Sequence, residues 1–324
     1  MKIPHLIPAS GWPSQTVIDL NYAKLGASLT PPDKLKEGGF AFFGLPFEGL
    51  NINEIGGKAG PTGMRKALSR LRPYSIDLDI NFLETNGFSD LGDIEVEHMD
   101  YDITFARTEA VYAEAMRRKW IPMVSGGSHS ITEPCLRAFS DHHKKNIGVV
   151  WFDGHPDLMD NYKGDKHYCG CPLRRNLESG HVKPENVVHI GMRGFANSAP
   201  DILEWREKGV TFITMEEFHT TPFEDIVEKS IEIATRGTDA FYVTFDIDAM
   251  DETFAPATQY NGPGGLYSYD AMRFVRRLGM AGAGAMDIAE YAPLVDLTGQ
   301  TGNICATLFA EFMAGKAWNM RQAS

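Results

Sequence analysis

Short, nearly continuous apolar runs recur along the chain and predict the strands of a buried sheet. The clearest are Ile-Gly-Val-Val-Trp-Phe at 147–152 and Ala-Phe-Tyr-Val-Thr-Phe at 240–245. Runs of about four to eight such residues are typical of strands covered on both faces. Strands are therefore predicted near 40–46, 121–125, 146–152, 186–192, 210–214, 240–246 and 283–288.

Helical patterns lie between these runs. One helix is predicted over 102–119, with an apolar face at Ile103, Ala106, Ala110 and Ala113. Another is expected to begin with Thr221 as cap and Pro222 at the first helical position, and to stop near Gly237. The segment 301–313 is interpreted as an amphipathic helix packed on the sheet. Alternating strands and helices predict an α/β fold with a mostly parallel sheet covered on both faces.

The domain organisation is expected to be simple. No Ser/Gly/Pro linker, repeat or low-complexity run interrupts the alternation, so residues 36–324 are predicted to form a single domain. Residues 1–35 are expected to be an N-terminal extension or arm.

The composition of the chain limits the classes of binding partner and the cellular compartment that we expect. The formal net charge of −12 argues against nucleic acid or an anionic membrane as a partner and is compatible with a cationic substrate. No leader-like start and no apolar run of about 18 residues is present, so a cytoplasmic location is expected. The four cysteines fit a reducing compartment.

Three polar clusters follow predicted core strands. They are Gly-Gly-Ser-His-Ser at 126–130, Asp-Gly-His-Pro-Asp at 153–157 and Asp-Ile-Asp at 246–248. Each alone is weak evidence, since a lone His or Asp-x-Asp is more often a loop or capping residue. Their shared placement is informative, because ligands of open α/β sheets bind beyond the carboxyl ends of the strands.

The donor set of these clusters predicts a metal site. Two imidazoles and four carboxylates suit Mn²⁺ and tolerate Ni²⁺, Co²⁺ or Fe²⁺, and no thiolate of a structural zinc site is offered. Carboxylates can bridge two ions about 3.5–4 Å apart, whereas a neutral imidazole cannot. The sequence therefore predicts two divalent ions per chain.

From about Phe40 to Met313 the chain resembles the ureohydrolase family, which includes arginase and agmatinase. Beside the three clusters, the resemblance rests on Gly-Pro at 60–61 with Arg65, Phe-Ala-Pro at 254–256, Gly-Pro-Gly-Gly-Leu at 262–266 and Asp-Ile-Ala-Glu-Tyr-Ala-Pro at 287–293. It implies a three-layer α/β/α arginase-like fold and a homo-oligomer, commonly a trimer or hexamer.

The resemblance also implies the roles of the site residues. One metal would be held by His129, Asp153, Asp157 and Asp246, and the other by His155, Asp153, Asp246 and Asp248. The metals would be Mn²⁺ by resemblance, and Ni²⁺ is an alternative because nickel-dependent relatives are known. A bridging hydroxide would attack the guanidinium carbon, with Asp157 orienting the hydroxide and Glu290 gripping the guanidinium.

Two departures from the family pattern concern proton delivery and the pocket mouth. Cys169 stands where the family has a proton-shuttling His, and His167 lies two residues upstream. Glu54 stands in a stretch where the family commonly carries Arg, and it suits a substrate without a free carboxylate. The predicted substrate is therefore not arginine, but agmatine, guanidine or a biguanide such as metformin.

Two alternatives remain open at this point. Cys169 is also compatible with a metal-binding but weakly active partner subunit of a heteromeric ureohydrolase. A mononuclear amide hydrolase of the deacetylase branch of this fold would need only three of the ligands and would bind one metal.

Overall fold

A nine-stranded, mostly parallel sheet forms the centre of the computed structural model, which describes residues 3–13, 22–49 and 56–323. The strand order is β1-β5-β2-β6-β11-β10-β7-β8-β9, and every neighbouring pair is parallel except β1 with β5. The strands of this sheet are β1 (Leu6–Ile7), β2 (Phe40–Leu45), β5 (Phe88–Ile94), β6 (Ile121–Gly126), β7 (Ile147–Phe152), β8 (Val187–Ile190), β9 (Thr211–Ile213), β10 (Ala240–Asp246) and β11 (Ala285–Ala289). The predicted parallel sheet is confirmed, and each of the seven expected strands has a counterpart.

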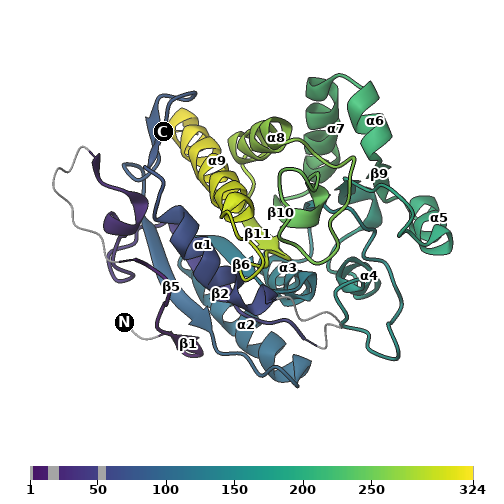
Figure 1. The fold of residues 1–324 in the computed structure, drawn as a ribbon, viewed down its shortest axis with the longest axis horizontal. Coiled ribbons are helices and arrows are strands. Elements are labelled where there is room, and N and C mark those ends of the chain that lie inside the picture. Colours follow the sequence, from purple (N-terminus) through teal and green to yellow (C-terminus); the bar gives the residue numbers. More distant parts are fainter. Residues whose placement is uncertain (1–2, 14–21, 50–55, 324) are drawn as a thin grey trace.

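Helices cover both faces of the sheet, so the molecule has three layers (Figure 1). One core contains side chains of α1 (Gly60–Leu68), α6 (Met215–Thr220), α7 (Phe223–Thr235), α8 (Ser268–Met280) and α9 (Gln300–Ala323). The second core contains side chains of α2 (Tyr101–Arg117), α3 (Thr132–His142), α4 (Pro172–Glu178) and α5 (Ala199–Glu207). Strand residues alternate between the cores, with Phe40 and Phe42 in the first and Ala41 and Phe43 in the second.

The N-terminal segment is joined to this sheet. Strand β1 pairs antiparallel with β5, placing Leu6 opposite Ile94, and Leu25 is fully buried in the first core. A small separate ribbon is formed by β3 (Tyr74–Ser75) and β4 (Ile80–Asn81). The boundary near residue 35 stays a prediction.

Strand β5 is missing from the sequence-based prediction because its interior is polar. Its Asp90 and Asp93 interrupt the apolar run, yet both pair with the fully buried Arg65 of α1. Arg65 Nε lies 2.7 Å from Asp90 Oδ2 and Nη1 lies 2.7 Å from Asp93 Oδ1. A strand stabilised by buried ion pairs gives no hydrophobic signal.

The apolar face predicted for the helix at 102–119 is wrong. Ile103, Ala106, Ala110 and Ala113 are exposed in α2, and the buried face carries Thr104, Phe105, Thr108, Val111, Tyr112, Ala115 and Met116. Both sets have helical spacing. The larger side chains bury more apolar area than the alanines do, so they face the sheet.

Two helix ends also differ from the prediction. Thr221 does not cap α7 but ends α6, and its N–H donates to Glu217 O. Helix α7 starts at Phe223 after an extended Pro222, since ψ of that residue is 133°. Helix α9 continues ten residues past Met313 to Ala323.

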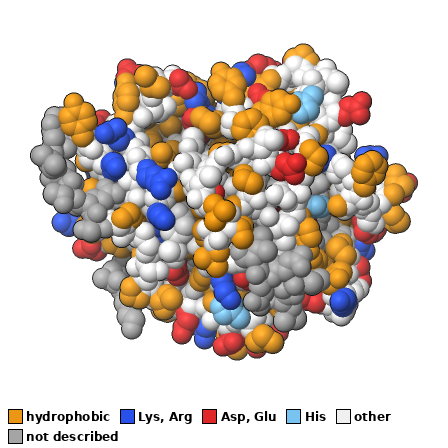
Figure 2. All heavy atoms as spheres, viewed as in Figure 1, with side chains coloured by type: hydrophobic (Ala, Val, Ile, Leu, Met, Phe, Trp, Pro, Cys, Tyr) orange, Lys and Arg blue, Asp and Glu red, His pale blue; other side chains and the backbone are white. Residues whose placement is uncertain are grey.

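Side chains of several kinds share the face of the molecule shown in Figure 2. Figure 2 shows acidic, basic and hydrophobic side chains interspersed, with one small group of Lys and Arg. Within the described ranges, no helix combines the length and apolarity needed to cross a bilayer.

Candidate metal centre and pocket

The predicted metal ligands and Glu290 meet at the carboxyl ends of four neighbouring strands, the ligands at β6, β7 and β10 and Glu290 at β11. The sheet order places β6, β11, β10 and β7 side by side. His129 follows β6 as the first residue of a 3₁₀ turn, Asp153 follows β7, Asp246 ends β10 and Glu290 follows β11. Parallel strands end at one edge of the sheet, which brings residues 161 positions apart into contact.

His129 is the centre of the first group of ligands. Its Nδ1 lies 3.0 Å from Asp153 Oδ2, 2.9 Å from Asp157 Oδ2 and 3.2 Å from Asp246 Oδ2. All four side chains are buried. Such a set of acceptor atoms around one ring nitrogen has the composition of a cation site rather than of an apolar core.

His155 is the centre of the second group. Its Nδ1 lies 2.9 Å from Asp248 Oδ2 and 3.5 Å from Asp153 Oδ1. The donor atoms of His129, Asp153 and Asp157 lie within 4.8 Å of one another, and so do those of Asp153, His155 and Asp248. Asp153 belongs to both groups, one through each carboxylate oxygen, which is the arrangement that a bridging ligand needs.

A buried hydrogen-bond chain fixes the orientation of His129. Thr244 Oγ1 donates to Asp287 Oδ1 at 2.6 Å, and His129 Nε2 lies 2.9 Å from the same hydroxyl. A hydroxyl has one proton, so Thr244 must accept the proton of His129 Nε2. The chain therefore keeps the Nε2 proton and leaves Nδ1 to face the carboxylates, as a metal ligand must. Sequence reasoning assigned no role to Thr244 or Asp287.

The charges of the cluster are strongly coupled. Burial lowers the pKa of His129, but its hydrogen bonds to Asp153, Asp157 and Asp246 raise the pKa well above the usual value. Burial also lowers the pKa of His155, but the charges of Asp248 and Asp153 raise it to about 12. Burial and the charge of Asp153 raise the pKa of Asp157 well above its usual value. In the absence of metal, protons thus take the place of the missing positive charge.

These residues fit a pair of divalent cations. Four buried carboxylates are too costly to keep ionised without cations, and the two imidazoles supply neutral donors once their Nδ1 protons leave. The site lacks thiolate ligands among the two described groups, which disfavours a structural zinc site.

Two residues at the centre have a left-handed backbone. Asp157 has φ of 51° and Glu290 has φ of 61°, and neither is glycine. Non-glycine residues in this region cost about 1–3 kcal/mol each and cluster at functional sites. Of the eight described non-glycine residues with positive φ, these two are the ones that lie at the ligand cluster.

Glu290 is fixed beside the ligands with its carboxylate facing the pocket. Its Oε1 accepts a hydrogen bond from the His129 backbone N–H at 2.7 Å, and its own N–H donates to Gly127 O at 2.7 Å. Burial raises the pKa of Glu290 to about 7. A cationic partner would restore the ionised form, because it would compensate the lost solvation.

A cavity of about 430 Å³ opens onto the carboxylate cluster. Its wall includes Met159, Tyr162, Tyr168, Cys169 and Tyr260, and its acidic members beyond the ligands are Asp160, Asp201 and Glu290. No Lys or Arg belongs to the lining among the described residues. The sequence-based prediction of site residues did not include the three tyrosines, because they lie in two loops and no periodic pattern distinguishes them.

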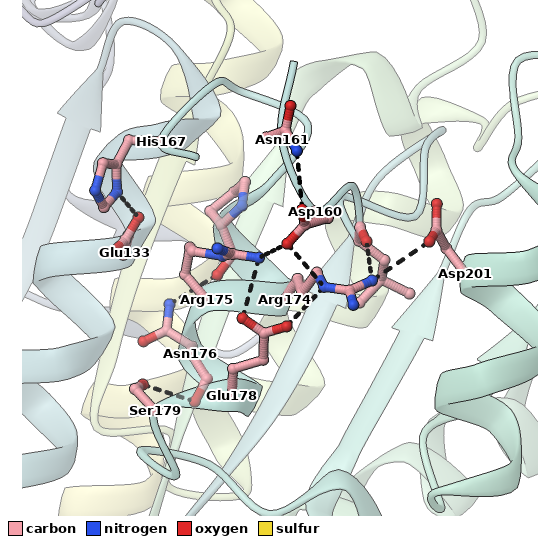
Figure 3. Close-up of polar contacts among 12 residues, drawn as sticks. Glu133, Asp160, Asn161, His167, Arg174, Arg175, Asn176, Glu178, Ser179 and Asp201 are labelled. Atoms are coloured by element: carbon pink, nitrogen blue, oxygen red, sulfur yellow. Dashed lines mark hydrogen bonds and ion pairs between the residues drawn. The ribbon is translucent and has the colours of Figure 1, made fainter. Parts of the chain in front are cut away.

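The two candidates for proton delivery have different surroundings. Cys169 lines the cavity, and burial together with the charges of Glu290 and Asp157 raises its thiol pKa well above the usual value. His167 is absent from the lining and is held instead by α3, with Nδ1 2.8 Å from Glu133 Oε2 (Figure 3). Glu54, the predicted determinant at the pocket mouth, lies outside the described residues.

The acids at the outer wall are already paired with arginines. Figure 3 shows Asp160 between Arg174 and Arg175, and Asp201 beside Arg174. Arg175 Nη2 lies 3.3 Å from Asp160 Oδ1, and Arg174 Nη1 lies 3.4 Å from Asp201 Oδ1. Both arginines are also bound by Glu178. The outer wall is therefore less negative than its carboxylates alone would suggest.

Comparisons with known proteins find similar sequences and a similar fold over most of the chain. The sequence model described as "Arginase family" matches residues 39–315. Formimidoylglutamase of Halalkalibacterium halodurans is 32% identical over 92% of this chain and 94% of its own length, and guanidinopropionase of Pseudomonas aeruginosa is 33% identical over 88% of each. The crystal structure of formimidoylglutamase from Bacillus subtilis superposes with a TM-score of 0.87 at 23% identity, covering 94% of each chain.

Proposed function

Because the chain belongs to the arginase family and is a hydrolase of C–N bonds in guanidino-type compounds, we propose that its substrate is a small cationic guanidine without a carboxylate. Agmatine, guanidine and biguanides such as metformin are of this class. One observation carries the proposal: the cavity has carboxylates at its base and no basic side chain among its described lining residues. A carboxylate in the substrate would enter without a cation to compensate its lost solvation.

The proposed substrate class differs from the one named for two similar relatives. The names formimidoylglutamase and guanidinopropionase refer to substrates with carboxylate groups, and both relatives are over 30% identical to this chain. Agmatinase of Gallus gallus, whose name refers to a substrate without one, is 29% identical. Overall identity therefore does not separate the substrates, and the charge of the pocket wall is the better guide.

The proposed metal ligands are His129, His155, Asp153, Asp157, Asp246 and Asp248. Two divalent cations held there would supply Lewis-acid activation of water at neutral pH. Mn²⁺ is proposed on the family relationship and Ni²⁺ as the alternative. Convergence of all six side chains supports two ions over the mononuclear alternative, which would leave three of these ligands idle.

The proposed roles of the chain's own residues follow from their positions. Glu290 would bind the guanidinium with its ionised carboxylate, and Asp157 would accept a hydrogen bond from the attacking water. Because Cys169 lines the cavity and His167 does not, Cys169 is the better placed donor for the leaving nitrogen, although its raised thiol pKa makes it a weak acid. His167 remains in the proposal only as a side chain that could reach the site if it left Glu133.

Metal analysis combined with a product assay tests the function. Protein grown with Mn²⁺ or Ni²⁺ should contain about two ions per chain and release a C–N cleavage product from agmatine, guanidine or a biguanide. Arginine and 3-guanidinopropionate should react at least about tenfold more slowly, which corresponds to about 1.4 kcal/mol. Preference for either carboxylate-bearing compound would overturn the substrate proposal and leave the family assignment intact.

Single substitutions test the proton donor. Cys169→Ala should lower kcat by about 10²-fold if the thiol delivers the proton, whereas His167→Ala should change it little. Equal rates in wild type and Cys169→Ala would remove this role. If metal-loaded wild type turns over only after a related chain is added, the partner-subunit alternative is correct.

Assembly and compartment are proposed on the family relationship. A homo-oligomer, either trimer or hexamer, in the cytoplasm is expected. Light scattering of the purified protein should give a mass of about three or six times 35.9 kDa. A monomer under all conditions would contradict this.

A further inference from the structure

We propose that Tyr168 and Tyr260 form an aromatic clasp that binds an alkyl substituent of the guanidine, so that the preferred substrates are N-alkylated guanidines or biguanides rather than diamine-like ones. This inference rests on the proposed function and narrows its substrate class. It concerns a subsite in the outer part of the cavity, beyond the metal ligands and Glu290.

The clasp joins two loops that are distant in the sequence. Tyr168 lies in the segment between β7 and α4, and Tyr260 lies between β10 and α8. Their hydroxyl oxygens are 2.9 Å apart, and both side chains line the cavity. This hydrogen bond connects residues 92 positions apart.

The position of the clasp relative to the reaction centre is given by His155. The ring centroids of Tyr260 and His155 are 5.7 Å apart with an interplanar angle of 72°. A guanidinium bound by Glu290 next to this histidine would have its substituent directed along the tyrosine faces. An aromatic face stabilises both an apolar group and a delocalised cation, by about 0.5–2 kcal/mol for the cation.

The two tyrosines differ in exposure and in the contacts that support them. Tyr168 is 8% exposed and is stacked on Tyr162, with ring centroids 4.7 Å apart, while Lys163 Nζ lies 5.4 Å from the centroid of the Tyr162 ring. Tyr260 is 39% exposed. Tyr168 is therefore the enclosed half of the clasp, and Tyr260 is the half exposed to solvent.

The outer wall disfavours a second positive charge on the substrate. Asp160 and Asp201 line the cavity, but each already pairs with Arg174, and Asp160 also pairs with Arg175 (Figure 3). A substrate ammonium group would gain little from these carboxylates, because guanidinium groups already compensate their charge. An alkyl end needs no charged partner and gains from contact with Met159 and the tyrosines.

A matched pair of substrates tests this directly. Butylguanidine and agmatine share a four-carbon chain and differ by the terminal amine. The metal-loaded enzyme should show kcat/KM for butylguanidine at least about tenfold above that for agmatine. An equal or higher value for agmatine would overturn the inference, although the proposed function would stand.

Substitution of Tyr260, the more exposed tyrosine of the clasp, gives a second test. Tyr260→Leu should raise KM for butylguanidine about fivefold to 30-fold, and by a clearly larger factor than KM for unsubstituted guanidine, because only the alkylated compound reaches the clasp. Tyr260→Phe keeps the ring and loses the hydroxyl bond to Tyr168, so its effect should be smaller. Tyr269→Leu is the control, since Tyr269 is 68% exposed on α8 and does not line the cavity.

Failure of the clasp and failure of the proposed function give different results. If guanidines are hydrolysed but Tyr260→Leu changes both KM values equally, the clasp is wrong. If no guanidino compound is hydrolysed, calorimetric binding of butylguanidinium to metal-loaded protein still tests the subsite. Binding that Tyr260→Leu weakens would support the clasp, and binding that the variant leaves unchanged would refute it.

Discussion

At the scale of single residues, the buried partners of His129 are as informative as the ligands themselves. Asp287 accepts hydrogen bonds from Thr244 at 2.6 Å and from Tyr242 at 2.7 Å, and burial raises its pKa. Thr244 in turn holds His129 Nε2. The Asp287 carboxylate is linked to His129 by two hydrogen bonds through Thr244. It therefore determines that Nδ1 is the imidazole nitrogen that is free to bind a metal.

Removing the Thr244 hydroxyl should weaken metal binding. Thr244→Val deprives His129 Nε2 of its acceptor, and the loss of such a partner typically costs about 10-fold to 100-fold in metal affinity. Calorimetric titration of metal-free protein with Mn²⁺ measures it. Thr108→Val is the matched control, because Thr108 is equally buried but bonds only to Thr104 O in α2. An unchanged affinity for Mn²⁺ in Thr244→Val would contradict the role assigned to the hydrogen bonds from His129 through Thr244 to Asp287.

Metal binding should release protons at pH 7. In the metal-free protein the pKa of His155 is about 12 and that of His129 is raised well above its usual value, so both imidazoles carry a proton that a metal must displace. Affinity should therefore increase as the pH rises. Titrations in two buffers of different ionisation enthalpy would give at least about one proton per ion. A heat of binding independent of buffer would show that the imidazoles are already neutral.

At the scale of elements, close packing of α8 against α9 depends on small residues. A Cβ on Gly315 would lie 2.2 Å from Arg276 O, and one on Gly279 would lie 2.6 Å from Phe312 O. Both neighbours are backbone atoms that a rotamer change cannot move. The glycines thus set the distance between the helices, although glycine is unfavourable within a helix.

Gly315→Ala should destabilise the protein for this reason. Alanine improves helix propensity by about 1 kcal/mol, but overpacking against backbone costs about 1–3 kcal/mol, and the 2.2 Å contact places this site at the upper end. Urea unfolding would measure the difference. Thr307→Ala is the control on the same helix, because its hydroxyl bonds only to Asn303 O. A more stable Gly315→Ala variant would show that the helices can separate at little cost.

Elements also show where sequence patterns suffice. Strands β7 and β10 were predictable because their residues are apolar on both faces, and they pair in register with Phe245 opposite Phe152. Strand β5 and the buried face of α2 were not. In β5 the stabilising groups are two aspartates that pair with Arg65 of α1. In α2 two sets of residues have helical spacing, and the packing buries the set with the larger side chains.

At the scale of the whole molecule, the cluster of carboxylates opposes folding unless cations are bound. Asp153 and Asp157 follow β7, Asp246 and Asp248 lie at the end of β10, and all four are buried. Their repulsion exists only when the sheet has assembled. Bound metal should therefore stabilise the complete fold rather than any one element.

Chelation should lower the melting temperature. A ligand present at about 100 times its Kd stabilises the folded state by about 2.7 kcal/mol, which corresponds to several degrees in a domain of this size. Scanning calorimetry with and without chelator, then with Mn²⁺ or Ni²⁺ restored, measures it. Asp246→Ala should lose most of the metal-dependent shift. A melting temperature that is the same with and without chelator, and in wild type and Asp246→Ala, would argue against a metal centre.

The sequence by itself determined the parallel sheet, the positions of most strands and the residues that meet at their carboxyl ends. It could do so because continuous apolar runs and the donor atoms beside them are local properties of the chain. Only the tertiary structure decided that Thr244 holds His129 Nε2, that His167 pairs with Glu133, and that Tyr168 meets Tyr260. These contacts join segments that are far apart in sequence, and their energies depend on burial and distance, which appear only when the layers pack.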